Sequence, residues 1–533
     1  MAKNKQTAIS AAMQRPDFYP HPVSKIEKRE THISIVFLTG QYVYKIKKPV
    51  DLGFLDFTTL EKRRYFCQQE VDLNRRLAPD VYLGVIPITA DKNCYLLAGP
   101  GEAVEYAVKM RQLPDDLSMR KLLRRGKVNE IQIRQLALTL AAFYRQAAVD
   151  DTKIAIGSWE TVCANCEENF NQTEMFTDSF LDERMFQIIR RATRSFLQKH
   201  RDLFDDRIAK GKICDCQGDL RVGHVYFEED GIKIIDCVEF NDRFRYADSA
   251  CDLAFLAMDL DFEGFPEIEQ QLLQSFSRQA DDNDVFVLID FYKCYRAFVR
   301  VKVNCLRLDA GGLGDYDRNR LLRETQTYLE LAYRYALNIS HPTLWIIGGI
   351  IGSGKSTIAK QLGVCLKARV LQSDVIRKDL FGLEPDTPAD VAFGEGLYSK
   401  EKTGLAYGKL LMLAQEELKK GDSVIMDATF SSLRYRREAR CLADSLDANF
   451  VIIECVADWP VIRRRLLSRE TGRSVSDARL HHLKKFRDAF EPLTEEEQHY
   501  TIRLNTERPA AENTHAILSQ NYALATRRTR AAF

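Results

Sequence analysis

The N-terminal part of the chain alternates between apolar and polar residues with a period of two. Such alternation predicts half-buried strands. The predicted strands are 32–39, 42–47, 81–88, 94–97 and 106–110. Gly40 and Gln41 separate the first two strands, as expected for a tight turn. Because the apolar residues of 59–77 have helical spacing instead, we expect a small strand-rich lobe with one helix over about 31–112.

Helical spacing dominates the next part of the chain, from about 113 to 338. Two β-like runs, 223–227 and 232–236, interrupt it. Residues 1–30 are polar and contain three prolines, so we expect a loosely structured lead-in there. A small strand-rich lobe followed by a larger helical lobe predicts a bilobal α+β domain over 31–338.

Strands and helices alternate from 342 to 505. Strands separated by helices in this way predict a doubly wound parallel sheet with helices on both faces. Residues 506–533 are polar and rich in arginine, and we expect them to pack loosely as a C-terminal tail. The chain as a whole is therefore predicted to be a multidomain α/β protein.

The composition describes a globular protein without a charge bias. The 533 residues are 45% hydrophobic and 29% charged, and 77 basic side chains against 76 acidic ones give a net charge of +1. This balance favours neither nucleic acid nor a membrane surface as a global partner, and no long apolar run predicts a membrane span. We expect a cytoplasmic protein with no membrane partner, and the oligomeric state stays open.

Thirteen cysteines are scattered along the chain, many of them in apolar runs. An odd number in such surroundings is typical of reduced, buried thiols. Two close pairs, Cys163 with Cys166 and Cys214 with Cys216, could together supply four zinc ligands. Their spacing fits no usual zinc motif, so structural zinc is the less favoured interpretation.

The clearest motif is a glycine-rich turn between an apolar strand and a helix, at 349–356. It fits G-x-x-x-x-G-K-[ST], in which backbone N–H groups surround phosphate oxygens, the lysine reaches the β- and γ-phosphates and the last hydroxyl binds magnesium. The alternative is a chance glycine-rich turn, which the preceding strand and the Lys-Ser ending disfavour. The residues predicted to bind ATP are Gly349, Gly352, Ser353, Gly354, Lys355, Ser356 and Thr357, with Lys355 also catalytic and Ser356 a ligand of Mg²⁺.

Further charged residues follow this loop. Asp374 ends the second predicted strand, where it could orient an acceptor hydroxyl as a catalytic residue, and Arg377, one helical turn later, could bind an anionic acceptor. Asp427 follows the next apolar run, as expected of a magnesium-supporting carboxylate. Arg465 and Arg469 share one helical face and are predicted to neutralise phosphate charge, with Arg469 catalytic and Arg465 nucleotide-binding. The competing interpretations are a helix N-cap for Asp374 and a solvated charged face for the arginines.

The first half contains a second set of candidate residues. Phosphoryl transfer needs a carboxylate near the acceptor hydroxyl and another on the metal ions, and Asp219 and Asp236 satisfy these requirements. A strand lysine paired with a helical carboxylate completes such a site, for which Lys45 and Glu70 are the candidates. Each aspartate alone could be an ordinary turn residue. Their order across two lobes favours the catalytic interpretation.

These residues stand in motifs that resemble a known family. The segment Gln217-Gly218-Asp219-Leu220 with the later Asp236 is similar to the catalytic loop and metal-binding aspartate of aminoglycoside phosphotransferase and choline kinase-like enzymes. With 31–34, 43–49, 54–57, 73–79 and 239–245, the chain resembles bacterial proteins that fuse such a protein kinase-like domain to a P-loop kinase-like domain. The resemblance implies that Asp219 is the catalytic base, that Asp236 binds magnesium, and that Lys45, held by Glu70, contacts the nucleotide. It also implies that Asp252 supports the loop.

Two positions depart from that pattern. Gln217 stands where the family has a histidine, and His224 where it has a metal-binding asparagine, so His224 becomes the candidate metal ligand. In the second half, 373–378, 427–430 and 476–478 resemble the P-loop kinases that include gluconate kinase, zeta toxins and polynucleotide kinase ends.

The predicted function is Mg²⁺- and ATP-dependent phosphotransfer to a hydroxyl of a small molecule (sugar, polyol or nucleoside) or to a nucleic-acid end. One alternative is an ATP-gated binding protein in which the first half is a catalytically silent pseudo-kinase and only the P-loop domain turns over ATP.

Overall fold

The chain folds into two compact units, each assembled from separate stretches of sequence. The computed structural model describes residues 2–91, 94–147, 149, 151–384, 396–470 and 480–531. The first unit comprises Met1–Phe186, Leu197–Ala280 and Tyr292–Ala332. The second comprises Gln187–Phe196, Asp281–Phe291 and Tyr333–Phe533, so it includes residues far upstream of the phosphate loop.

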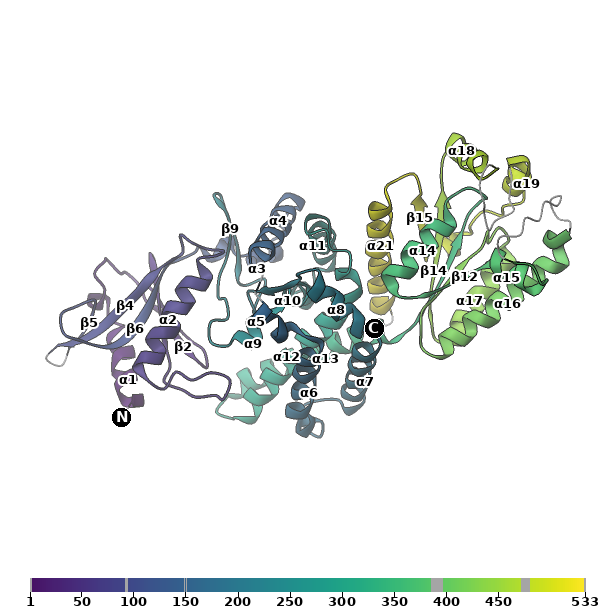
Figure 1. Cartoon of the computed structure of the whole chain (residues 1–533). Helices are drawn as coiled ribbons and strands as arrows, with labels where there is room; N and C mark the ends of the chain where they lie inside the picture. The colour runs from purple at the N-terminus through teal and green to yellow at the C-terminus, as the bar shows by residue number, and fades with distance from the viewer. Residues whose placement is uncertain are drawn as a thin grey trace. The chain divides into compact units, whose positions relative to one another are not determined.

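A six-stranded antiparallel sheet forms the small lobe of the first unit (Figure 1). In sheet order its strands are β1 (Glu27–Glu30), β2 (Ser34–Leu38), β3 (Tyr42–Lys47), β6 (Glu102–Arg111), β4 (Tyr82–Asp91) and β5 (Cys94–Leu97). The predicted hairpin is present, because β2 pairs with β3 from Ser34↔Lys47 to Leu38↔Val43. Gly40 in its turn has φ +93°, a conformation that glycine adopts without strain.

Two helices cover the two faces of this sheet. On one face, Ile9 of α1 (Ala2–Ala12) and the following Met13 pack against Tyr44 and Ile46 of β3. On the other, α2 (Leu60–Asn74) packs Cys67 and Val71 against the sheet. The expectation of a loosely structured lead-in at 1–30 is wrong, because the few apolar residues of this polar segment are spaced to reach the core.

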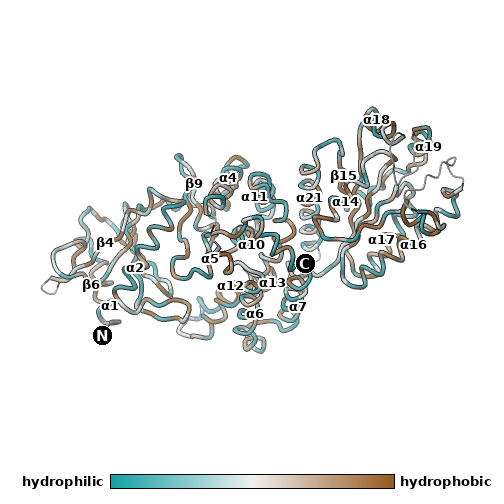
Figure 2. Tube along the Cα trace, in the orientation of Figure 1, coloured by the Kyte–Doolittle hydropathy of each residue, from teal (hydrophilic) through white to brown (hydrophobic). Residues whose placement is uncertain are grey.

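The larger lobe of the first unit is mainly helical. Helix α10 (Ser249–Phe262) is buried on nearly all sides and is largely hydrophobic in Figure 2. Two short strand pairs, β7 (Ile213–Asp215) with β10 (Tyr246–Asp248) and β8 (Val225–Glu228) with β9 (Gly231–Ile234), carry the loops that contain Asp219 and Asp236. The small lobe also contains η1 (Pro16–Phe18). The other helices of the larger lobe are η2 (Asp115–Leu117), α3 (Met119–Arg124), α4 (Glu130–Gln146), α5 (Asp151–Ile154), η3 (Ala155–Gly157), α6 (Trp159–Thr173), η4 (Glu174–Phe176), α7 (Glu183–Lys199), α8 (Arg201–Ala209), α9 (Asp242–Arg245), α11 (Pro266–Gln279), α12 (Val285–Asp309) and α13 (Asp315–Ser340). Of these, α7, α12 and α13 also contribute residues to the second unit.

A five-stranded parallel sheet forms the centre of the second unit. In sheet order its strands are β12 (Arg369–Gln372), β13 (Val424–Asp427), β11 (Thr343–Gly348), β14 (Asn449–Val456) and β15 (Thr501–Asn505). All four pairings are parallel, so every strand ends at the same edge of the sheet. This edge is where ligands bind in open α/β sheets.

Helices cover both faces of this sheet, as the sequence predicted. Alternate residues of β11 point to opposite faces: Leu344 and Ile346 pack with α16 (Lys400–Lys419) and α17 (Leu433–Ser445), while Trp345 and Ile347 pack with α14 (Lys355–Leu366) and α21 (Ala510–Ala531). The remaining helices are α15 (Ser373–Leu380), η5 (Gly396–Tyr398), α18 (Trp459–Glu470), η6 (Leu480–His482), α19 (Leu483–Asp488) and α20 (Glu495–Gln498).

The segment predicted to be a loose tail, 506–533, is instead an integral helix. Ile517 and Leu518 of α21 are 2% and 3% exposed and belong to the core beside β15. Apart from this tail and the lead-in, the fold class is confirmed: a bilobal α+β half followed by a doubly wound parallel-sheet half. Among the described residues, no helix combines the length and apolar content needed to cross a bilayer.

Candidate functional sites

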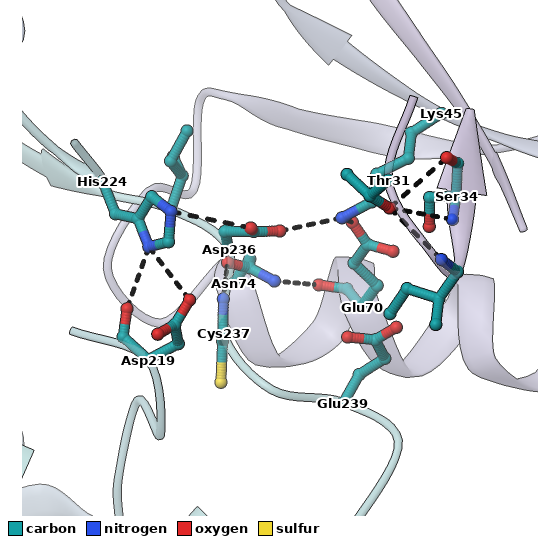
Figure 3. A network of polar contacts seen from close by, with 12 residues as sticks. Thr31, Ser34, Lys45, Glu70, Asn74, Asp219, His224, Asp236, Cys237 and Glu239 are labelled. Carbon is teal, nitrogen blue, oxygen red and sulfur yellow. Dashed lines mark hydrogen bonds and ion pairs between the residues drawn. The ribbon is translucent and has the colours of Figure 1, made fainter. Parts of the chain in front are cut away.

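An ion-pair network that is buried except at Asp236 joins the two lobes of the first unit (Figure 3). Lys45 Nζ on β3 lies 2.8 Å from Glu70 Oε1 on α2 and 2.8 Å from Asp236 Oδ1 on the loop after β9. Burial would lower the pKa of Lys45, but Asp236 and Glu70 outweigh it and raise that pKa well above its usual value. The charge of Lys45 outweighs the effect of burial on Asp236 and holds the pKa of that carboxyl far below its usual range, and the pKa of Glu70 is lowered as well. All three groups are therefore charged at neutral pH.

Lys47, which sequence reasoning missed, extends this network. It stands two residues after Lys45, so both side chains point to the same face of the sheet. Its Nζ lies 2.8 Å from Glu70 Oε2 and also contacts Glu239 Oε1, and the side chain is fully buried. The signal in the sequence was the second lysine of an alternating strand, together with Glu239 in the 239–245 motif.

The loop after β7 brings Asp219 and His224 opposite Asp236. One acceptor atom from each of the three side chains lies within 4.8 Å of the others, the one such metal-ligand group of His, Cys, Asp and Glu among the described residues. The cysteine pairs considered for zinc form no comparable group within that part of the chain. Asp236 itself has φ +66°, an unfavourable backbone conformation for a non-glycine residue.

Asp252 stabilises the backbone of the loop that contains Asp219. Its carboxylate accepts hydrogen bonds from the backbone N–H groups of Gln217 at 3.0 Å and Gly218 at 2.9 Å. Burial raises the pKa of Asp252, and Arg296 and these N–H donors oppose that effect. The bracing position expected for Asp252 is confirmed by these two hydrogen bonds.

In the second unit, β11 runs into the glycine-rich turn and then α14. Gly349, Gly352 and Gly354 have φ values of +139°, +76° and +94°. A Cβ built on Gly349 would lie 2.5 Å from the carbonyl oxygen of Cys455, so any side chain there forces the turn open. Lys355 Nζ lies 2.9 Å from the carbonyl oxygen of Ile350, which folds the lysine back over the turn. This is the conformation of a phosphate loop.

Asp427 stands beside this loop at the carboxyl edge of the sheet. Its strand register places it next to Ile347 of β11 and Gln372 of β12. Gln372 Nε2 donates to Asp427 Oδ2 at 3.3 Å. Burial raises the pKa of Asp427, while Lys355 and a hydrogen bond from Ser356 oppose that effect. A serine hydroxyl and a buried carboxylate thus face the same point, an oxygen donor pair that suits a hard cation.

Asp374 and Arg377 lie on α15, which begins directly after β12. Arg377 Nη1 donates to Asp374 Oδ1 at 3.0 Å, and its guanidinium lies over the ring of Tyr398, 4.4 Å from the centroid. The structure therefore brings together the two residues predicted to handle the acceptor. Arg377 is 6% exposed, and its Nε has no hydrogen-bond partner.

Arg465 lies against the underside of the phosphate loop. It donates to the carbonyl oxygens of Gly352 at 3.4 Å and Thr506 at 2.8 Å, and to Thr506 Oγ1 at 3.0 Å. The nucleotide-binding role predicted for Arg465 stays a prediction. The side chain of Arg469 and the 476–478 segment lie outside the described residues.

A phosphate loop lies at the carboxyl edge of a parallel sheet whose strand order is β12-β13-β11-β14-β15. This combination defines the second unit as a P-loop domain. Residues 344–493 match the family model described as an AAA domain. The chain belongs to the family of three mycobacterial proteins that carry the name uncharacterized protein: Mb2027c of Mycobacterium bovis, and MT2060 and Rv2004c of Mycobacterium tuberculosis. Each is 31% identical over 468 residues, which cover 86% of this chain and 90% of the relative.

Solved structures resemble parts of the chain. A choline/ethanolamine kinase family protein from Mesorhizobium loti has 12% identity and a TM-score of 0.37, and the match covers 62% of this chain and 99% of that one. A protein from Chloroflexus aurantiacus that is described as a kinase has 20% identity and a TM-score of 0.27, and the match covers 34% of this chain and 98% of that one. Kti12 from Chaetomium thermophilum, solved with ADP-AlF3, has 17% identity, a TM-score of 0.27 and the same coverage.

Proposed function

We propose that the second unit transfers the γ-phosphate of ATP to a hydroxyl group. The observation that carries this proposal is the convergence of the phosphate loop, Asp427 and Asp374 at one edge of one sheet. The turn at 349–356 binds the β- and γ-phosphates through backbone N–H groups, and Lys355 balances their charge. Asp374 accepts a hydrogen bond from the acceptor hydroxyl and orients it toward the γ-phosphate.

Magnesium fits the donors present at this edge. Ser356 and Asp427 offer only oxygen atoms, and Asp427 is a buried carboxylate already hydrogen-bonded by Ser356. Magnesium, when bound with ATP, neutralises charge on the phosphates. Arg377 binds an anionic or polar group of the acceptor, since its guanidinium has a free Nε–H and is held by Tyr398.

The acceptor class is a sugar, a polyol, a nucleoside or a nucleic-acid end. A net charge of +1 does not favour a long nucleic acid, whose binding depends on many phosphate contacts. A short end remains compatible with the arginines of α18. We further propose a cytoplasmic location.

The test is ATP consumption by the full chain with pooled acceptors. Lys355→Ala is expected to reduce turnover at least about a hundredfold, the scale of losing one preorganised charge contact. The matched control is Lys360→Ala, an exposed lysine on the same helix α14. Phosphorylated acceptors are identified by a mass gain of about 80 Da. Unchanged turnover in Lys355→Ala would refute the proposal.

A second candidate function assigns turnover to the second unit alone, with the first unit as a nucleotide-gated binding domain. It is favoured by Gln217 and His224, which replace the residues usual in active relatives of this fold. Asp219→Asn distinguishes a silent first unit from an active one, because the change removes the catalytic base that the family resemblance implies for the first unit. Loss of part of the ATP consumption supports two active units. No loss with Asp219→Asn, together with loss of ATP consumption in Lys355→Ala, supports the gated form.

A further inference from the structure

The metal-ligand group of the first unit contains an imidazole whose hydrogen-bonding state is fixed by its surroundings. His224 Nδ1 lies 2.9 Å from the backbone carbonyl oxygen of Asp219. A carbonyl oxygen can only accept, so Nδ1 carries the hydrogen. In the neutral imidazole, Nε2 is then left with its lone pair. Donation from one ring nitrogen to a carbonyl is the usual arrangement for a histidine whose other nitrogen binds a metal.

The lone pair of Nε2 points at another acceptor. His224 Nε2 lies 3.8 Å from Asp236 Oδ2, while the other oxygen, Asp236 Oδ1, is paired with Lys45. Asp219 Oδ2 lies 3.8 Å from Nδ1 on the other side of the ring. Figure 3 shows this order, with His224 between the two aspartates. In the neutral tautomer these two acceptors face each other across a gap that a cation can bridge.

The distance and access suit a metal ion. Two bonds of about 2.1 Å each, usual for imidazole and carboxylate ligands, can span the separation of Nε2 and Oδ2. The side chains of His224, Asp219 and Asp236 are 20%, 30% and 46% exposed, so an ion can reach them. Magnesium fits this donor set poorly, because it prefers oxygen ligands, whereas imidazole suits the first-row transition ions.

We propose that the first unit binds a divalent first-row transition ion through His224 Nε2 and Asp236 Oδ2, in preference to Mg²⁺. Asp219 contributes a further carboxylate close by. The second unit, with its oxygen donors Ser356 and Asp427, retains magnesium. One chain therefore sorts two kinds of divalent ion by ligand chemistry. This inference rests on the proposed function only for the magnesium site of the second unit.

The test uses Mn²⁺ and the full chain with Ser356→Ala and Asp427→Asn, which remove the magnesium ligands of the second unit. Pulsed electron paramagnetic resonance of bound Mn²⁺, with a non-hydrolysable ATP analogue, reports nitrogen atoms coordinated to the ion. Uniform ¹⁵N labelling of the protein distinguishes its nitrogens from those of the nucleotide. We expect a directly coordinated ¹⁵N signal that is absent after His224→Asn. We also expect His224→Asn to shift the Mn²⁺/Mg²⁺ preference toward Mg²⁺ by roughly tenfold or more.

The matched control is His499→Asn. His499 Nδ1 also lies close to a carbonyl oxygen, that of Glu495 at 3.0 Å, but His499 is not in a metal-ligand group of the described residues. His499→Asn should change neither the directly coordinated ¹⁵N signal nor the Mn²⁺/Mg²⁺ preference. Bound Mn²⁺ without a coordinated protein nitrogen would overturn the proposal, and labelled wild-type protein gives that answer even if a variant misfolds. Because the signal reports ligation, it can fail while Lys355→Ala still abolishes turnover, and the reverse.

Discussion

Thr506 donates its hydroxyl hydrogen to the carbonyl oxygen of Ser353, at 2.6 Å, across 153 residues of sequence. This bond fixes the phosphate loop from the residue that follows β15, and Arg465 Nη1 donates to the same hydroxyl oxygen at 3.0 Å. The loop therefore depends on a residue that no part of the glycine motif specifies.

Thr506→Val is expected to weaken ATP binding without removing any atom that faces the phosphates. The change keeps the shape but loses the hydrogen bond to Ser353, a net contribution of about 1 kcal/mol, so the Kd should rise roughly five- to tenfold. Isothermal titration calorimetry measures the Kd for ATP. Thr501→Val is the control, because Thr501 on β15 also donates to a carbonyl oxygen, that of Glu497, at 2.6 Å. Equal effects of both changes would contradict a specific role for Thr506.

Gly349→Ala should weaken nucleotide binding strongly. A Cβ there would lie 2.5 Å from the Cys455 carbonyl oxygen, and the φ of +139° is strained for alanine, so the turn has to open. We expect the Kd for ATP to rise at least about a hundredfold, equivalent to roughly 3 kcal/mol. Gly408→Ala, in α16 with no atom within 4 Å of the added Cβ, should leave binding unchanged. It should also raise stability by about 0.5–1 kcal/mol.

Lys47→Met should destabilise the first unit strongly. Glu70 and Glu239 would then lie buried together with one fewer compensating charge, and breaking such a buried network by removing one partner typically lowers the free energy of unfolding by about 3–5 kcal/mol. Urea unfolding followed by hydrogen exchange at β3 measures the loss.

The neighbouring Lys48 provides the control for that experiment. It pairs with Glu30, whose side chain is 50% exposed, so Lys48→Met should lower the free energy of unfolding by about 1 kcal/mol or less. A loss for Lys47→Met no larger than this would show that the network adds little to stability.

Asp427→Asn should stabilise the second unit in the absence of ligand at neutral pH, although it removes a proposed magnesium ligand. Burial raises the pKa of Asp427, so the folded protein binds this proton more tightly than the unfolded chain. The contribution of Asp427 to stability is therefore greatest at acid pH and is lost as the pH rises through the folded pKa. The variant should melt higher than wild type at pH 7, with a smaller difference near pH 4, in nucleotide- and magnesium-free buffer.

Asp379→Asn is the control for this pH dependence, because Asp379 is an exposed aspartate on α15. It should leave the melting temperature nearly unchanged at both pH values. If wild type melts higher than Asp427→Asn at neutral pH, the raised pKa of Asp427 is refuted.

Local patterns carried much of the prediction. The β2–β3 hairpin, helix α2 and the parallel sheet follow from periodicity, and Lys45, Glu70 and Asp236 meet as the motif order implied. The errors at both ends of the chain have a different cause. In α1 and α21 a few apolar residues sit among many polar ones, and only the partner surface shows which of them are buried. Lys47 and Thr506 were missed because neither belongs to a motif that assigns it a partner, as the motif order did for Lys45.

Phe286 packs against the core of the second unit, although it lies far upstream of Pro342, where the strand and helix alternation of that unit begins in the sequence. Its ring centroid lies 5.7 Å from that of His515 and 6.1 Å from that of Tyr522, both on α21. A fragment that starts at Pro342 lacks the Asp281–Phe291 stretch and leaves this patch of α21 bare. The compact unit that holds the phosphate loop therefore begins upstream of Pro342 in the sequence, and a version of it cut at Pro342 exposes apolar surface on α21.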